Sequence, residues 1–162
     1  MHLRELVRED AARCAELEEQ LFSGDTPWSK ENFELEFQQP YNFYLGVEEE
    51  GLLVGYAGIG LRGHVDDPEF EILTIGTDPK HQRRGIGRMM MDNICYIADL
   101  KKAPLFLEVR VGNDPAIEMY KAYGFKHLGI RRNYYQPSGA DAHTMKRDSV
   151  TDKNSDKTPE QP

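Results

Sequence analysis

Residues 82–88 read Gln82-Arg83-Arg84-Gly85-Ile86-Gly87-Arg88 and lie between a strand-like run and a helix-like run. Upstream, residues 71–77 are rich in β-branched side chains, and downstream residues 88–100 carry apolar side chains at helical spacing. The first amides of a helix have no partner within the helix, the helix dipole is positive at that end, and glycine lets the backbone approach a bulky anion. The three arginines add formal positive charge. The stretch therefore predicts a site for a phosphorylated cofactor.

The spacing of the glycines narrows the choice of cofactor. A P-loop needs four residues between its glycines and then Gly-Lys-Ser/Thr, and a dinucleotide fingerprint needs three glycines; the chain has neither here. Its pattern, Q-x-x-G-x-G, resembles the acetyl-CoA pyrophosphate loop of the GNAT superfamily of N-acetyltransferases, which accepts Gln82 in place of Arg. From these six residues alone, a glycine turn that only starts a helix remains an alternative.

Three further segments carry the same resemblance. Residues 105–125 contain L-E-V-R-x-x-N-x-x-A-I-x-x-Y-x-x-x-G-F, residues 130–135 read I-R-R-N-Y-Y, and residues 27–29 read P-W-S. Together they resemble the ribosomal-protein-alanine N-acetyltransferases, the RimI branch of the superfamily. The resemblance spans about residues 3–146. It implies an α/β (α+β) fold with a mixed, mostly antiparallel sheet, in which the fourth and fifth strands are parallel and splayed.

Hydrophobic patterning predicts the same order of elements. Strands are expected at 3–6, 43–47, 52–59, 69–77, 105–109, 126–132 and 142–146, and helices at 9–22, 29–37, 84–100 and 115–123. Ser29 suits a helix cap, and 48–51 suits a hairpin loop. This order predicts one domain over residues 1–147 with helices on both faces of the sheet. Residues 148–162 are polar and predict a disordered C-terminal tail.

Composition limits the function classes. The chain has 162 residues and a formal net charge of −8, which argues against direct binding of nucleic acid and suits a basic acceptor. No secretory signal or membrane-length apolar run is seen, so we expect a cytoplasmic protein that binds no membrane. Cys14 and Cys95 are expected to be buried thiols. The histidines form no ligand cluster, so we expect no metal.

Glu108 is the candidate base for acetyl transfer. Strand alternation places Phe106, Glu108 and Arg110 on one face, and a carboxylate at a cleft can take a proton from an amine. An ordinary ion pair between Glu108 and Arg110 is the competing interpretation; the resemblance favours the base, which is the matching Glu of L-E-V-R. Glu71 on the fourth strand is a second carboxylate that could act through water.

Tyr120 is the candidate acid that protonates the coenzyme thiolate. On pattern alone it is a core residue, because it belongs to an apolar helical stripe with Met119 and Tyr123. The resemblance assigns the acid to this tyrosine and adds a cofactor contact. Asn113 suits a helix cap, and the resemblance implies that its side chain also contacts the cofactor.

The remaining site residues follow from the resemblance and from residue type. Backbone groups of Ile75, Gly76 and Thr77 are expected to bind the pantetheine arm, and residues 83–88 (Arg83, Arg84, Gly85, Ile86, Gly87 and Arg88) to bind the pyrophosphate. Gly76 suits a site where a ligand runs close to the backbone. The aromatic side chains of Trp28, Tyr134 and Tyr135 are expected either to form the wall of the acceptor site or to pack at the surface.

The resemblance implies an enzyme that moves acetyl from acetyl-CoA to the N-terminal α-amine of a protein, by direct attack in a ternary complex. The implied acceptor is the N-terminal alanine of a small-subunit ribosomal protein. Two alternatives stay open: an acetyltransferase for lysine side chains or small amines such as polyamines, and a non-catalytic acyl-CoA sensor.

Overall fold

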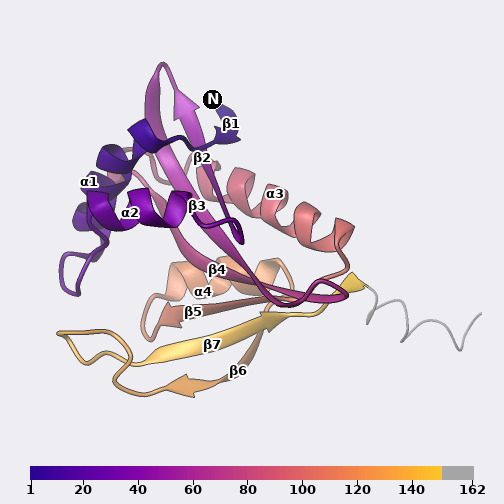
Figure 1. The fold of residues 1–162 in the computed structure, drawn as a ribbon. Helices are drawn as coiled ribbons and strands as arrows, with labels where there is room; N and C mark the ends of the chain where they lie inside the picture. The colour runs from indigo at the N-terminus through magenta and orange to yellow at the C-terminus, as the bar shows by residue number, and fades with distance from the viewer. Residues whose placement is uncertain (151–162) are drawn as a thin grey trace, which may run out of the picture.

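The structure is a computed structural model, and it describes residues 1–150. A twisted seven-stranded sheet in the order β1-β2-β3-β4-β5-β7-β6 forms the centre of the molecule (Figure 1). The strands are β1 (His2–Glu5), β2 (Asn42–Glu49), β3 (Leu52–His64), β4 (Asp67–Thr77), β5 (Leu105–Arg110), β6 (Lys126–Arg131) and β7 (Ala142–Arg147). The helices are α1 (Ala11–Phe22), α2 (Lys30–Phe37), α3 (Ile86–Leu100) and α4 (Asp114–Ala122), with short 3-10 turns at Arg8–Asp10 and Pro79–His81.

One pair of strands is parallel and soon separates. β4 and β5 pair only through Phe70 with Leu105 and Glu71 with Phe106, whereas all other neighbours are antiparallel. Between Ile72 and Thr74, the register with β3 shifts and leaves Leu73 as an extra residue. A bulge of this kind bends a strand and increases its twist. It lies where β4 leaves β5, and the expected splayed parallel pair is confirmed.

Helices cover both faces of the sheet, as expected. α3 and α4 pack on one face over a core that contains Ile72, Met90 and Leu107. α1 and α2 pack on the other face over a second core, which includes Leu17, Phe33 and Tyr56. Both layers are visible in Figure 1, where α1 and α2 lie on the opposite side of the sheet from α3. The face of each strand residue is therefore known from the core that it joins.

Several element ends differ from the predicted ones. β3 continues to His64, beyond the expected end at residue 59, because it pairs with β4 as far as Asp67. α3 starts at Ile86 instead of residue 84, because Gly85 is left-handed with φ 82°. Ser29 caps α2 as predicted and accepts a hydrogen bond from the Asn32 N–H.

The end of the described chain lies against the domain. Asp148 is within ion-pair distance of Lys126 and Lys146, at 3.6 and 3.7 Å, and Ser149 is buried. The rest of the expected tail, residues 151–162, lies outside the described residues. Cys14 and Cys95 are both buried, as expected. Within residues 1–150 no helix has the length and apolar character needed to cross a membrane.

Candidate active site

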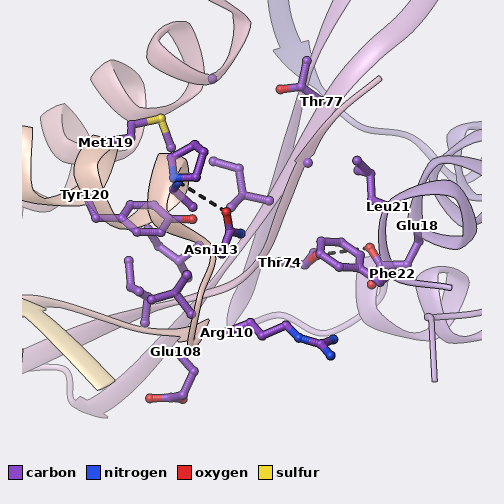
Figure 2. Close-up of a pocket in the computed structure, with 18 of the residues that line it drawn as sticks. Glu18, Leu21, Phe22, Thr74, Thr77, Glu108, Arg110, Asn113, Met119 and Tyr120 are labelled. Atoms are coloured by element: carbon purple, nitrogen blue, oxygen red, sulfur yellow. Dashed lines mark hydrogen bonds between the residues drawn. The ribbon is translucent and has the colours of Figure 1, made fainter. Parts of the chain in front are cut away.

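A cavity of about 1380 Å³ opens where β4 and β5 separate. Its walls come from α1 and the loop after it, β4, the start of α3, β5, the first turns of α4 and the loop after β6. Figure 2 shows Asn113, Met119 and Tyr120 on one side of this opening and Glu18, Leu21 and Phe22 on the other. The gap in the sheet thus joins the two faces of the molecule.

The glycine turn forms one end of the cavity. Arg83 and Gly85 have φ values of 66° and 82°, and this tight turn leads directly into α3. The cap residue of α3, Gly85, supplies no side-chain hydrogen bond, so the first amides of the helix keep their donors for a ligand. The predicted residues that line the cavity here are Arg83, Gly85, Ile86, Gly87 and Arg88.

Arg84 is the one member of this predicted set that does not line the cavity. Its guanidinium lies 2.9 Å from a carboxylate oxygen of Glu49 at the end of β2. The side chain is about half exposed, at 48%. The turn thus directs Arg83 and Arg84 to different surroundings.

The edge of β4 faces the opening with unpaired backbone groups. The Asp78 N–H donates to the Val54 carbonyl of β3 at 2.8 Å. Backbone N–H groups alternate in direction along a strand, so those of Gly76 and Thr74 point to β3, and those of Ile75 and Thr77 point away from β3 toward the gap. Beyond Glu71, β5 does not pair with β4, so these two amides are available to a ligand.

Gly76 lines the cavity, and the packing around it explains why this position has no side chain. A Cβ at this position would lie 2.6 Å from a methyl carbon of Leu21 and 2.7 Å from the Tyr56 hydroxyl. The glycine is therefore required by the packing of α1 and β3 against β4, independently of any ligand.

Tyr120 and Asn113 bring α4 to the cavity. Tyr120 packs against Phe125 with ring centroids 5.7 Å apart and is only 6% exposed. Within residues 1–150, its hydroxyl has no protein hydrogen-bond partner, and burial raises the pKa of this phenol well above its usual value. Asn113 caps α4 through a 3.4 Å hydrogen bond from the Ala116 N–H, which Figure 2 shows, and also lines the cavity.

Glu108 lines the cavity from the other face of the sheet. Leu107 and Val109 belong to the core under α3 and α4, so Glu108 and Arg110 face the side of α1 and α2. The alternative ion pair between Glu108 and Arg110 does not form. Glu108 instead lies 3.5 Å from Arg131, and Arg110 pairs with Asp25 at 2.5 Å.

Glu71 shares this face with Glu108. It pairs in register with Gly60 and with Phe106, and its carboxylate lies 3.6 Å from the guanidinium of Arg62. Glu71 lines the cavity but is about a third exposed, at 36%, compared with 14% for the Glu108 side chain. The two carboxylates therefore differ in their contact with water.

The three predicted aromatic residues all line the cavity. Trp28 also packs on the buried Phe33, with ring centroids 5.2 Å apart, so one part of its ring system belongs to the core under α1 and α2. Tyr134 and Tyr135 meet edge to face at 5.0 Å, and the Arg131 guanidinium lies 5.1 Å from the Tyr134 ring. These contacts hold the rings of Tyr134 and Tyr135 in place at the edge of the cavity.

Two acidic residues of the site were missed from the sequence. Asp25 accepts hydrogen bonds from the Arg110 guanidinium and, at 3.0 Å, from the Ser138 N–H. The neighbouring Thr26 N–H donates to the Gln136 carbonyl at 2.8 Å. These bonds join the loop after α1 to the loop after β6. The other is Glu18, buried in the wall of the cavity. The helical spacing of Cys14, Leu17, Glu18 and Leu21 is the sequence signal that could have identified it.

The model of the acetyltransferase (GNAT) family matches residues 7–125 of the chain. The N-alpha-acetyltransferase RimI of Mycobacterium tuberculosis is 49% identical over 144 residues, covering 89% of this chain and 90% of that protein. A putative [ribosomal protein bS18]-alanine N-acetyltransferase of Bacillus subtilis is 36% identical over 145 residues, covering 88% and 92%.

A solved structure agrees with these sequence relatives. The ribosomal-protein-S18-alanine N-acetyltransferase of Escherichia coli has a TM-score of 0.77 at 28% identity, covering 90% of this chain and 92% of that one. The sequence matches extend over most of each chain, and the fold is the same. The chain belongs to the acetyltransferase (GNAT) family and is a RimI-like N-acetyltransferase.

Proposed function

We propose that this enzyme transfers acetyl from acetyl-CoA to the N-terminal α-amine of a protein, with Glu108 as base and Tyr120 as acid. The observation that carries the proposal is the cavity that crosses the sheet, with the glycine turn and Tyr120 on the side of α3 and α4 and Glu108 on the opposite side. Cofactor and acceptor can then approach the gap from opposite faces. Such an arrangement suits direct transfer in a ternary complex.

The cofactor would lie along groups that already face the cavity. Its pyrophosphate suits the turn at residues 83–88, where helix amides and the Arg83 and Arg88 side chains supply positive potential. Its pantetheine arm suits the open edge of β4, with the N–H groups of Ile75 and Thr77 as donors. These donors also suit the thioester oxygen as negative charge develops on it.

The two proposed proton transfers take place on opposite faces of the sheet, one at Glu108 and the other at Tyr120. A free α-amine has a pKa of about 8, so most of it is protonated near neutral pH and must lose a proton before attack. Glu108 accepts that proton on the acceptor side. The neutral nitrogen attacks the thioester carbon, the carbon–sulfur bond breaks, and Tyr120 donates its proton to the departing thiolate. The nitrogen loses its second proton as the amide forms, and this proton makes good the one that Tyr120 has given, so the tyrosine ends the cycle protonated. Burial keeps Tyr120 protonated and ready for this step.

A cysteine intermediate does not fit the site. Burial raises the pKa of the Cys14 thiol to about 12, and within the described part of the chain neither Cys14 nor Cys95 lines the cavity. A thiol that stays protonated is a poor nucleophile. Replacement of both cysteines by alanine is therefore expected to leave turnover largely intact.

The proposed acceptor is the N-terminal alanine of a small-subunit ribosomal protein. Its support is the relatives that are named for bS18-alanine acetylation and match this chain over most of their length. The acceptor side also carries the carboxylates of Glu18, Glu71 and Glu108, a charge that attracts a cationic N-terminus.

Mass spectrometry of a peptide with a free N-terminal alanine, incubated with enzyme and acetyl-CoA, tests the proposal. A matched peptide with a blocked N-terminus and an internal lysine is the control. We expect one added acetyl group on the free peptide alone. Modification of the blocked peptide would assign the enzyme to lysine acetylation. If neither peptide is acetylated but polyamines are, the enzyme would be assigned to small amines.

A further inference from the structure

The acceptor side of the cavity contains a buried carboxylate that takes no part in the proton transfers proposed above. Glu18 is 4% exposed and is surrounded by the core between α1, α2 and the sheet. Its Oε2 atom accepts hydrogen bonds from the hydroxyls of Tyr56, at 2.5 Å, and Thr74, at 3.2 Å. Figure 2 shows the bond to Thr74. Buried carboxylates are retained where such partners satisfy them.

The two hydroxyl groups that donate to Glu18 differ in their access to the cavity. Tyr56 is fully buried at 0% exposure and does not line the cavity, whereas Thr74 is half-buried and lines it. A threonine hydroxyl has one proton to donate and two lone pairs that accept. Because Thr74 donates its proton to Glu18, the cavity meets only the lone pairs of this oxygen.

Thr74 also lies at the right place for the acceptor. It follows the bulge at Leu73, where β4 leaves β5, and its bond to α1 puts it on the same sheet face as Glu71 and Glu108. An approaching peptide offers hydrogen-bond donors first, namely the N–H groups of its α-amine and of its second residue. An oxygen that only accepts is complementary to such donors.

We infer that Thr74 is an acceptor-binding residue, which accepts a hydrogen bond from an N–H group of the incoming N-terminus. Glu18 is the positioning residue that fixes the direction of the Thr74 hydroxyl through the bond to its Oε2 atom. The inference rests on the proposed function, since it concerns the amine that this enzyme acetylates. It adds two residues to the site that neither catalyse proton transfer nor touch the cofactor loop.

Steady-state kinetics of Thr74→Val and Thr74→Ser with the alanine peptide test the role of Thr74. Valine has the same shape without the hydroxyl, so the KM for the peptide is expected to rise about five- to ten-fold, the effect of one lost hydrogen bond. The KM for acetyl-CoA should stay within about two-fold, because the backbone of β4 is unchanged. Serine restores the hydroxyl and should return the peptide KM toward the wild-type value.

Glu18→Gln and Tyr56→Phe separate positioning from a merely structural role. Glutamine offers a donor as well as an acceptor, so the Thr74 hydroxyl is no longer fixed and the peptide KM should rise. When Glu18→Gln is added to Thr74→Val, the peptide KM should rise by less than about two-fold over that of Thr74→Val alone, because the two residues act as one unit. Tyr56→Phe removes the other hydroxyl from Glu18 and should lower Tm while leaving the peptide KM unchanged.

Three results would overturn the inference: an unchanged peptide KM in Thr74→Val, no rescue by serine, or an equal rise in the KM for acetyl-CoA. These differ from a failure of the proposed function, in which the wild-type enzyme would leave every free N-terminus unmodified. An equal rise in peptide KM with Tyr56→Phe would assign Glu18 to core stability alone.

Discussion

The carboxylate of Glu108 on β5 pairs with the guanidinium of Arg131 on β6, 3.5 Å away, across the intervening strand β7. Arg131 is 58% exposed, so water screens this pair and leaves it weak. Arg110, the nearer arginine in sequence, is engaged by Asp25. Glu108 is therefore mostly buried at the cavity wall, and among residues 1–150 it has no strong permanent partner.

Replacement of Glu108 by glutamine should lower kcat with the alanine peptide by about 100-fold or more, because the amide keeps the shape and cannot accept the proton. Affinity for acetyl-CoA, measured by calorimetry, should stay nearly unchanged. Glu71→Gln is the matched control, since this carboxylate lies on the same face but already faces Arg62. A larger loss for Glu71→Gln than for Glu108→Gln would transfer the role of base to Glu71.

Tyr120→Phe should lower kcat by about 10- to 100-fold through the loss of the acid. Tm should change little, because the ring still packs on Phe125 and its hydroxyl has no protein partner within residues 1–150. Since burial raises the pKa of Tyr120, the wild-type rate should show no fall as pH rises toward the ordinary tyrosine pKa of about 10. A rate that falls with tyrosine ionisation in this range in the wild type but not in Tyr120→Phe would contradict the raised pKa of Tyr120, whereas an unchanged kcat in Tyr120→Phe would exclude Tyr120 as the acid.

Arg83→Ala and Arg84→Ala form a matched pair at the glycine turn. Arg83 lines the cavity, so its loss should raise the KM for acetyl-CoA by about five- to ten-fold through a lost charge-assisted contact. Arg84 pairs with Glu49 on the exposed side, so its loss should change this KM by less than about two-fold. A higher salt concentration should reduce the difference between the two variants in the KM for acetyl-CoA, because salt screens the contact of Arg83 with the cofactor. Equal effects of the two changes would show that Arg84 reaches the cofactor.

Glu18 should give the folded protein a distinct pH dependence. Burial raises the pKa of its carboxyl, while hydrogen bonds from Tyr56 and Thr74 oppose the shift. Its contribution to the free energy of unfolding is fully present below the ordinary pKa of about 4.3 and is lost as pH rises through the raised folded value. Asp10, whose pKa is lowered chiefly by its hydrogen bond from Arg4, has the opposite effect at lower pH.

Urea unfolding across pH measures this contribution. Glu18→Gln should unfold with a flatter pH dependence above about pH 4.3 than the wild type. Glu19→Gln, an exposed neighbour on α1, is the control and should follow the wild-type curve. Identical curves for all three proteins would mean that Glu18 has the same pKa in the folded and unfolded states.

The order of elements was predictable because hydrophobic periodicity and turn residues are local features of the chain. The cap at Ser29, the glycine turn before α3 and the alternation of Glu108 with Leu107 all follow from residues close in sequence. The ion-pair partners of charged side chains were not predictable from such local features. Arg110 lies two residues from Glu108 on the same face, yet it pairs with Asp25, 85 positions away along the chain. Only the folded arrangement of the two loops decides that choice.

The sequence by itself therefore determined the family, the element order, the glycine turn and many, but not all, of the residues that line one cavity. The tertiary structure decided which of them meet: Glu18 with Thr74, Asp25 with Arg110, and Arg84 with Glu49 instead of the cavity. It also gave Gly76 a packing reason that its sequence context hides. The physical reason is that backbone propensities act over a few residues, whereas charge pairing and burial depend on distances that exist only after β4 and β5 separate and α1 packs beside them.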